Sequence, residues 1–101
     1  MAERTAEVRL LPAATQQLSD MLKDEQRLPG VVELYGLLRE IENFGIIALS
    51  AMYDSKSIRL LEKLDGGTSV YELKLNGILA YIAIDGNRFV LVSVKPSNNN
   101  T

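Results

Sequence analysis

The chain has 101 residues, which is enough for one domain built around a single core. Apolar residues make up 47% and charged residues 24%, the profile of a soluble globular protein, and no apolar run is long enough to cross a membrane. With no cysteine or histidine, disulfides and Ser-His or Cys-His nucleophile pairs are excluded, we expect no metal or cofactor, and a net charge of -2 argues against a dedicated nucleic-acid binder while leaving room for a local basic patch.

The N-terminal segment lacks the apolar stretch of a signal peptide, so we expect a cytoplasmic protein. From Ala6 to Pro12 the chain alternates, with Val8 and Leu10 on one side and Arg9 on the other. This period of two predicts a short strand, and Pro12 suits the first turn of a helix that follows it.

Two helices are predicted next, joined by a short turn. The first begins near residue 13, and its apolar residues follow helical spacing: Ala14, Leu18, Met21 and Leu22. Pro29 and Gly30 mark the turn, and a second helix runs from about Val31 to Phe44. Its apolar stripe is broad: Leu34, Leu37, Leu38, Ile41 and Phe44. Gly45 fits the position just after a helix, so the pair reads as a helical hairpin.

The segment from Ile46 to Ser57 is apolar without a clean period. We expect a loop or a short turn of helix that packs along the core. The stretch from Ile58 to Gly67 then leads into the sheet, with leucine side chains as anchors.

A three-stranded meander is predicted from Tyr71 to Pro96. Asn76-Gly77 between two alternating runs indicates a hairpin with a type I′ turn. Asp85-Gly86-Asn87 reads as a three-residue turn. With the first strand added, we expect an α+β domain over residues 1–96, in which two helices pack on one face of a four-stranded antiparallel sheet, and a disordered tail over residues 97–101.

The predicted register assigns each strand residue to one of two sheet faces. The face toward the helices holds Tyr71, Leu73, Leu75, Ile78, Ala80, Ile82, Ile84, Val90, Val92 and Val94. The open face holds Val70, Glu72, Lys74, Leu79, Tyr81, Ala83, Phe89, Leu91, Ser93 and Lys95, together with Arg9. Such a half-apolar face with cations suits a homodimer or partner interface, which the spacing alone favours over a catalytic surface, and it could also hold a polyanion.

The order of elements and three segments, "VRLLPAATQQL", "LLEKLDGGTSVYELKL" and "ILAYIAIDGNRFVLVSVKP", resemble the RelE/ParE toxin superfamily, particularly its HigB-like and phage-derived branch. The resemblance spans about Val8 to Pro96. Its most specific residues are Leu64, Gly67, Tyr71, Glu72 and Leu73.

That resemblance implies a toxin of a bacterial or phage toxin–antitoxin system, with a cognate antitoxin as partner and mRNA on the ribosome as substrate. Many such toxins are metal-independent endoribonucleases that use the RNA 2′-hydroxyl as nucleophile, whereas the ParE branch poisons DNA gyrase. Carried over by position, the catalytic residues would be Lys63, Lys74, Tyr81 and Lys95.

The chain also departs from the family pattern. Where many active members have an arginine, it reads Leu79-Ala80-Tyr81, and it is acidic overall. Arg59 and Lys56 could supply charge, but solvated surface positions are the favoured reading for both. A second hypothesis therefore stays open: a diverged, non-catalytic protein that uses the open sheet face for homodimer or partner binding.

Overall fold

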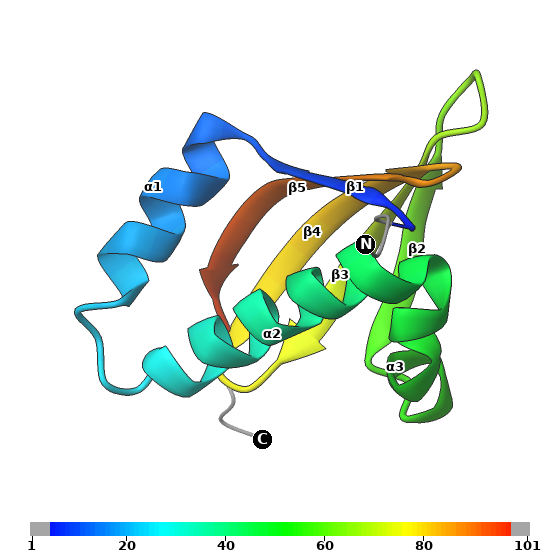
Figure 1. The fold of residues 1–101 in the computed structure, drawn as a ribbon. Helices are drawn as coiled ribbons and strands as arrows, with labels where there is room; N and C mark the ends of the chain where they lie inside the picture. The colour runs from blue at the N-terminus through cyan, green and yellow to red at the C-terminus, as the bar shows by residue number, and fades with distance from the viewer. Residues whose placement is uncertain (1–4, 98–101) are drawn as a thin grey trace.

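A computed structural model of the protein describes residues 5–97 (Figure 1). The elements in chain order are β1 (Glu7–Leu10), α1 (Pro12–Met21), α2 (Leu28–Phe44), the 3₁₀ helix η1 (Gly45–Leu49), α3 (Ser50–Asp54), β2 (Ile58–Lys63), β3 (Ser69–Leu75), β4 (Ile78–Asp85) and β5 (Arg88–Pro96). No helix in this part of the chain is long and apolar enough to span a membrane.

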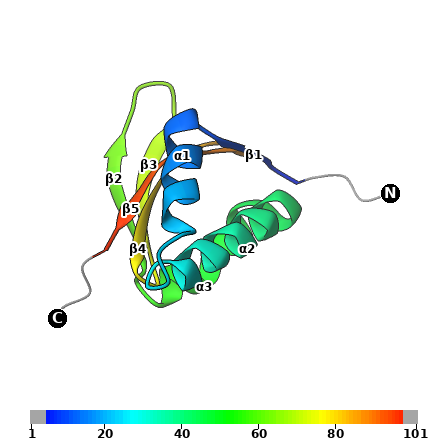
Figure 2. The same ribbon diagram turned by 90° about the vertical axis from the view of Figure 1, so that its left-hand side faces the viewer.

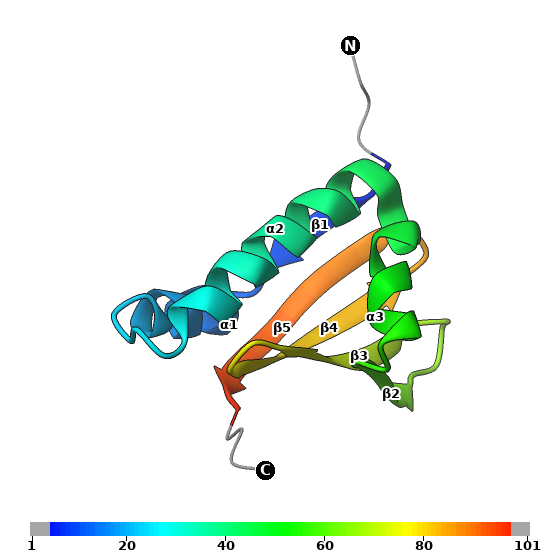
Figure 3. The same cartoon turned by 90° about the horizontal axis from the view of Figure 1, so that it is seen from below.

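The strands form one five-stranded sheet in the order β1-β5-β4-β3-β2. Strands β2 to β5 are a four-stranded antiparallel meander, and β1 runs parallel to β5 at the edge. All helices lie on one side of this sheet, and the other side is left open (Figures 2 and 3). The expected α+β architecture with helices on one face is therefore confirmed, and the predicted three-stranded meander is present as β3, β4 and β5. The expected four-stranded, all-antiparallel sheet is wrong, because β2 adds a fifth strand and β1 is parallel to β5.

Strand β2 was not predicted from the sequence, because Leu61 is an extra residue in the ladder. Leu60 pairs with Tyr71 and Glu62 pairs with Val70, so Leu61 has no partner. A bulge of this kind breaks the alternation by which a strand is recognised. β1 is parallel to β5, and the long connection between these two strands runs through the helices and β2 to β4.

The two long helices bury the stripes that their spacing predicted. α1 buries Ala14, Leu18 and Met21, whereas Leu22 lies beyond its end and is exposed, contrary to expectation. α2 buries Val31, Leu34, Leu38 and Ile41, while Leu37 is half-buried and Phe44 is exposed. Gly45 follows α2 with a φ of 65°, as predicted for a glycine just after the end of a helix.

Helix α2 begins at Leu28, earlier than predicted, so that Pro29 and Gly30 belong to its first turn. Gly30 is buried against the β3–β4 hairpin: a Cβ there would overlap the carbonyl oxygen of Asn76 and lie 2.9 Å from Cγ1 of Ile78. The glycine is therefore needed for close packing between helix and sheet rather than for a turn. The next segment forms η1 and α3, in line with the expected short helical turn, and Leu49 of η1 is fully buried.

The β3–β4 hairpin has the predicted register, with Leu75 opposite Ile78. Its turn is not type I′, however, because only Gly77 has a positive φ (81°) and Asn76 does not. These signs match a type II turn, in which the second central residue takes the positive φ.

The register of β5 differs from the prediction. The β4–β5 loop has two residues, Gly86 and Asn87, so Asp85 pairs with Arg88. One residue fewer in the loop moves Phe89 and Leu91 to the helix side, where they are 1% and 0% exposed.

Their neighbours Val90 and Val92 move away from the helix side and are half-buried. The four assignments for residues 89–92 were therefore wrong. Val92 has no partner in the ladder, and this bulge restores the predicted faces of Val94 and Lys95.

Arg27 connects the α1–α2 loop to the far end of the sheet. Its Nη1 donates to the carbonyl oxygens of Gly77 (3.2 Å) and Ser97 (3.1 Å), and the Ser97 N–H donates to the Gly77 carbonyl at 2.9 Å. Ser97, which the sequence placed at the start of a disordered tail, is only 7% exposed. The rest of that predicted tail, 98–101, lies outside the described residues.

Candidate nucleic-acid interface on the open sheet face

The open face of the sheet is defined by strand register. Its residues on β3, β4 and β5 are Val70, Glu72, Lys74, Leu79, Tyr81, Ala83, Val90, Ser93 and Lys95. Arg9 joins it from β1, since Val8 and Leu10 pack against the core, and it forms an ion pair with Glu7 at 2.9 Å. No helix of the described chain covers this side, so these side chains are available to a partner (Figure 2).

A row of three polar side chains crosses β2, β3 and β4. Arg59, Glu72 and Tyr81 are direct neighbours in the ladder. Arg59 Nη2 lies 3.0 Å from Glu72 Oε1, and the Tyr81 hydroxyl donates to Glu72 Oε2 at 2.9 Å. The Glu72 side chain is 18% exposed and that of Arg59 is 69% exposed. Both carboxylate oxygens are thus engaged, and the phenol of Tyr81 is held in one orientation.

Lys95 and Lys74 flank this row on the same face. The Lys95 ammonium lies 5.5 Å from the centroid of the Tyr81 ring, a cation–π distance. Leu79 pairs with Lys74 on one side and with Lys95 on the other, so the two lysines are two strands apart in one row. Lys74 and Lys95 are both exposed. The predicted set Lys74, Tyr81 and Lys95 is therefore brought together on one face.

Lys63, the fourth predicted residue, is not part of this group. It is the last residue of β2 and pairs with Ser69, whose partner on β4 is the buried Ile84. By register Lys63 points to the helix side of the sheet, at the edge strand. Its proposed catalytic role has no support from the arrangement of the other three.

Arg59 and Glu72 are the members that sequence reasoning undervalued. Arg59 was interpreted as a solvated surface charge, and Glu72 was placed on the open face without a chemical role. The alternation of residues 69–75 was enough to place Glu72 opposite Tyr81. Arg59 could be placed only by finding β2, whose bulge obscures the pattern.

Chemically, the site offers exposed cations beside an aromatic ring and a phenol held by a hydrogen bond. Lysine and arginine side chains attract phosphate, and a tyrosine ring is a stacking platform for an unpaired base. Glu72 reduces the local positive charge but provides a proton acceptor at the centre. Among residues 5–97, no three acidic side chains come together in a cluster that could bind a metal ion.

The architecture is that of the RelE-like fold. The chain superposes on a chain from the crystal structure of an archaeal RelE–RelB complex from Pyrococcus horikoshii OT3 with a TM-score of 0.62, over 94% of this chain and 98% of the other, at 13% sequence identity. The similarity is to a RelE complex rather than to a HigB-like protein. No protein-family model and no curated protein sequence matches the chain.

Proposed function

We propose that this chain is the toxin-like member of a toxin–antitoxin pair, and that it binds and cleaves RNA in the cytoplasm through the open sheet face without a metal. The observation that carries the proposal is the grouping of Tyr81, Lys74 and Lys95 on the uncovered face of a RelE-like sheet. The similar archaeal structure is a complex of two proteins, so we propose a protein partner for this chain as well.

In this proposal Lys74 and Lys95 stabilise the charge of the scissile phosphate, which increases as the reaction proceeds. The 2′-oxygen bonds to phosphorus while the bond from phosphorus to the 5′-oxygen breaks. The Glu72 carboxylate takes the proton of the 2′-hydroxyl, and the Tyr81 hydroxyl, already oriented by Glu72, gives its proton to the departing 5′-oxygen. The products are a cyclic 2′,3′-phosphate and a free 5′-hydroxyl.

The test is controlled expression combined with mapping of transcript ends, followed by cleavage assays with and without ribosomes. Tyr81→Phe keeps the ring and removes the proton, so we expect cleavage to fall about 10²-fold. Lys74→Gln and Lys95→Gln should each reduce the salt dependence of RNA binding by roughly 0.7 in log–log slope. Lys63→Gln, on the other side of the sheet, is the matched control and should change neither. Intact transcripts and normal growth would defeat the nuclease proposal.

A second candidate function is partner binding without catalysis. It is favoured by the engagement of both Glu72 oxygens with Arg59 and Tyr81, which leaves a partly neutralised face among half-buried apolar side chains. Such a face suits a protein interface. If it is the functional surface, Leu79→Lys should weaken association, measured by size in solution, while RNA binding is absent in the unmodified protein.

A further inference from the structure

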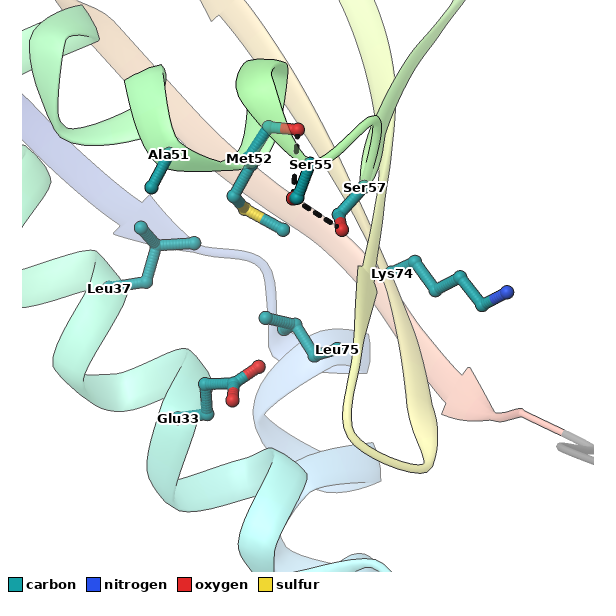
Figure 4. Close-up of a pocket in the computed structure, with 8 residues that line it drawn as sticks. All are labelled: Glu33, Leu37, Ala51, Met52, Ser55, Ser57, Lys74 and Leu75. Atoms are coloured by element: carbon teal, nitrogen blue, oxygen red, sulfur yellow. Dashed lines mark hydrogen bonds between the residues drawn. The ribbon is translucent and has the colours of Figure 1, made fainter.

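A cavity of about 210 Å³ lies between α2, α3 and the end of β3 (Figure 4). Its walls come from three elements: Leu37 of α2, Ala51 and Met52 of α3, and Leu75 at the end of β3. These side chains are apolar, and Met52 is flexible enough to adapt to what enters. Binding sites for drug-sized molecules begin at roughly 300 Å³, so this space fits one apolar side chain better than a complete small ligand.

The polar rim of the cavity presents acceptors. The Ser55 hydroxyl donates to the Met52 carbonyl at 3.3 Å and lies 2.8 Å from the Ser57 hydroxyl. Because each hydroxyl has one hydrogen, Ser57 is the donor of that second bond and its own oxygen keeps free lone pairs. Across the cavity, the Glu33 carboxylate makes no hydrogen bond or ion pair with any residue of the range 5–97.

Among the described residues that line the cavity, no cation faces the acceptors. Lys74 lines the cavity, but its amine points away from the space (Figure 4). A group entering beside the apolar side chain therefore gains most if it is a donor and carries positive charge. Lysine and arginine are the side chains that meet this condition.

Acidic and apolar side chains continue to alternate along α2 beyond the cavity. Glu33, Leu37, Glu40 and Phe44 follow one another at i, i+4, i+7 and i+11, so they share one line on the helix. Phe44 is 60% exposed and Glu40 is exposed. At 1.5 Å per residue, Phe44 provides a second apolar contact about 10 Å beyond Leu37, with a carboxylate between the two.

We propose that this cavity is the docking point for a segment of a partner protein that inserts a Leu or Met side chain between α2 and α3 and places an adjacent Lys or Arg against Glu33. Nucleic acid is a poor occupant, because the free carboxylates of Glu33 and Glu40 repel phosphate. The exposed Lys63-Leu64 pair of a second copy is a poorer match, because Glu62 and Asp65 on either side of it would bring carboxylates next to Glu33. We therefore assign the site to a different protein.

The test uses short peptides and the methyl NMR signals of Met52, Leu37 and Leu75. The probes are acetyl-Lys-Leu-Lys-amide, acetyl-Glu-Leu-Glu-amide and acetyl-Lys-Ser-Lys-amide. We expect the lysine–leucine peptide to shift the NMR signals of the cavity methyl groups at millimolar concentration. The glutamate–leucine peptide should bind about three-fold more weakly for each lysine replaced by glutamate. The lysine–serine peptide should leave the methyl signals unchanged.

Three variants make the result specific. Ala51→Phe fills the cavity from an exposed position and should abolish binding of the first peptide, whereas Ser50→Phe, next to it and outside the cavity, should not. Glu33→Gln should bring the leucine peptides with lysine and glutamate close to equal affinity. All three should keep the RNA binding of the unmodified chain, so failure here is distinguishable from failure of the proposed function.

Equal binding of the lysine and glutamate peptides, or full binding by Ala51→Phe, would overturn the proposal. Shifts of the cavity methyls that grow with protein concentration in the absence of peptide would overturn it in favour of a second copy. Each variant is first checked by its melting temperature and backbone spectrum, and Ser50→Phe reports on the fold if Ala51→Phe is disturbed.

Discussion

The two faces of the sheet differ in the side chains that they can carry. On the helix side, Leu73, Ile78 and Ile82 are fully buried, and the ladder partners of Leu73 and Ile78 are all apolar. On the open side, residues that alternate with them include Glu72, Lys74 and Tyr81. A face that must exclude water is restricted to apolar side chains, whereas a face with no cover can carry charges and hydroxyls. The open side is therefore where the sheet has room for chemistry.

The largest expected effect separates these faces within β5. Phe89→Ala removes a side chain that is 1% exposed and should cost about 3–5 kcal/mol of the free energy of unfolding. Val90→Ala, at the next residue on the other face, should cost less than about 1.5 kcal/mol because Val90 is half-buried. Urea unfolding of both variants gives the comparison. Equal losses would show that the assigned register of β5 is wrong.

The next effect compares two glycines of α2. Gly30→Ala places a methyl group against the Asn76 carbonyl and should destabilise the fold by about 1–3 kcal/mol. Gly36→Ala meets no atom within 4 Å and should stabilise the fold by up to about 1 kcal/mol, through helix propensity. Thermal melts of the pair measure the difference. If Gly30→Ala left the melting temperature unchanged, α2 would not be in close contact with the β3–β4 turn.

A smaller effect measures the polar row of the open face. In a double-mutant cycle of Glu72→Gln and Tyr81→Phe, we expect a coupling of about 1 kcal/mol from the hydrogen bond between their side chains. Equilibrium unfolding gives the four free energies. A coupling of zero would indicate that the phenol is not held by Glu72 in solution, and the proposed proton donor would lose its orientation.

The smallest effect lies on the helix side, at Tyr53 of α3. Burial, assisted by a hydrogen bond and charge interaction with Tyr71, raises the pKa of Tyr53 above its ordinary value of 10.0. In alkaline solution the unfolded chain then loses this proton first, so stability falls as pH rises through the folded pKa. Ultraviolet titration of the phenols, with Tyr53→Phe as the difference, should show one group titrating late. If Tyr53→Phe instead removed a group that titrates near the ordinary value of 10.0, the contact between Tyr53 and Tyr71 would be contradicted.

Much of the fold follows from local patterns. The spacing of α1 and α2 predicted their buried stripes, and Asn76-Gly77 fixed the β3–β4 register. The β4–β5 register was predicted wrongly because Asp85-Gly86-Asn87 allows loops of two or three residues, and only tertiary packing decides between them. The long-range pairing of β1 with β5 has no local signature.

The candidate site was predictable to the same extent. Tyr81, Lys74 and Lys95 were placed together correctly, because the β3–β4 register was right and the bulge at Val92 restored that of Lys95. Arg59 was missed with β2, and Lys63 was placed with the others although it lies on the opposite side. The cavity between α2 and α3 depends on how a segment without periodicity packs, which no pattern in residues 46–57 encodes.

The position of β5 has a consequence for synthesis. β5 is the last strand of residues 5–97, yet it lies between β1 and β4 in the sheet. A nascent chain emerging from the ribosome therefore holds its first strand without a neighbour until residues 88–91 have cleared the exit tunnel. Products of interrupted translation that end before residue 88 therefore lack the strand that joins β1 to β4 and cannot form the finished sheet.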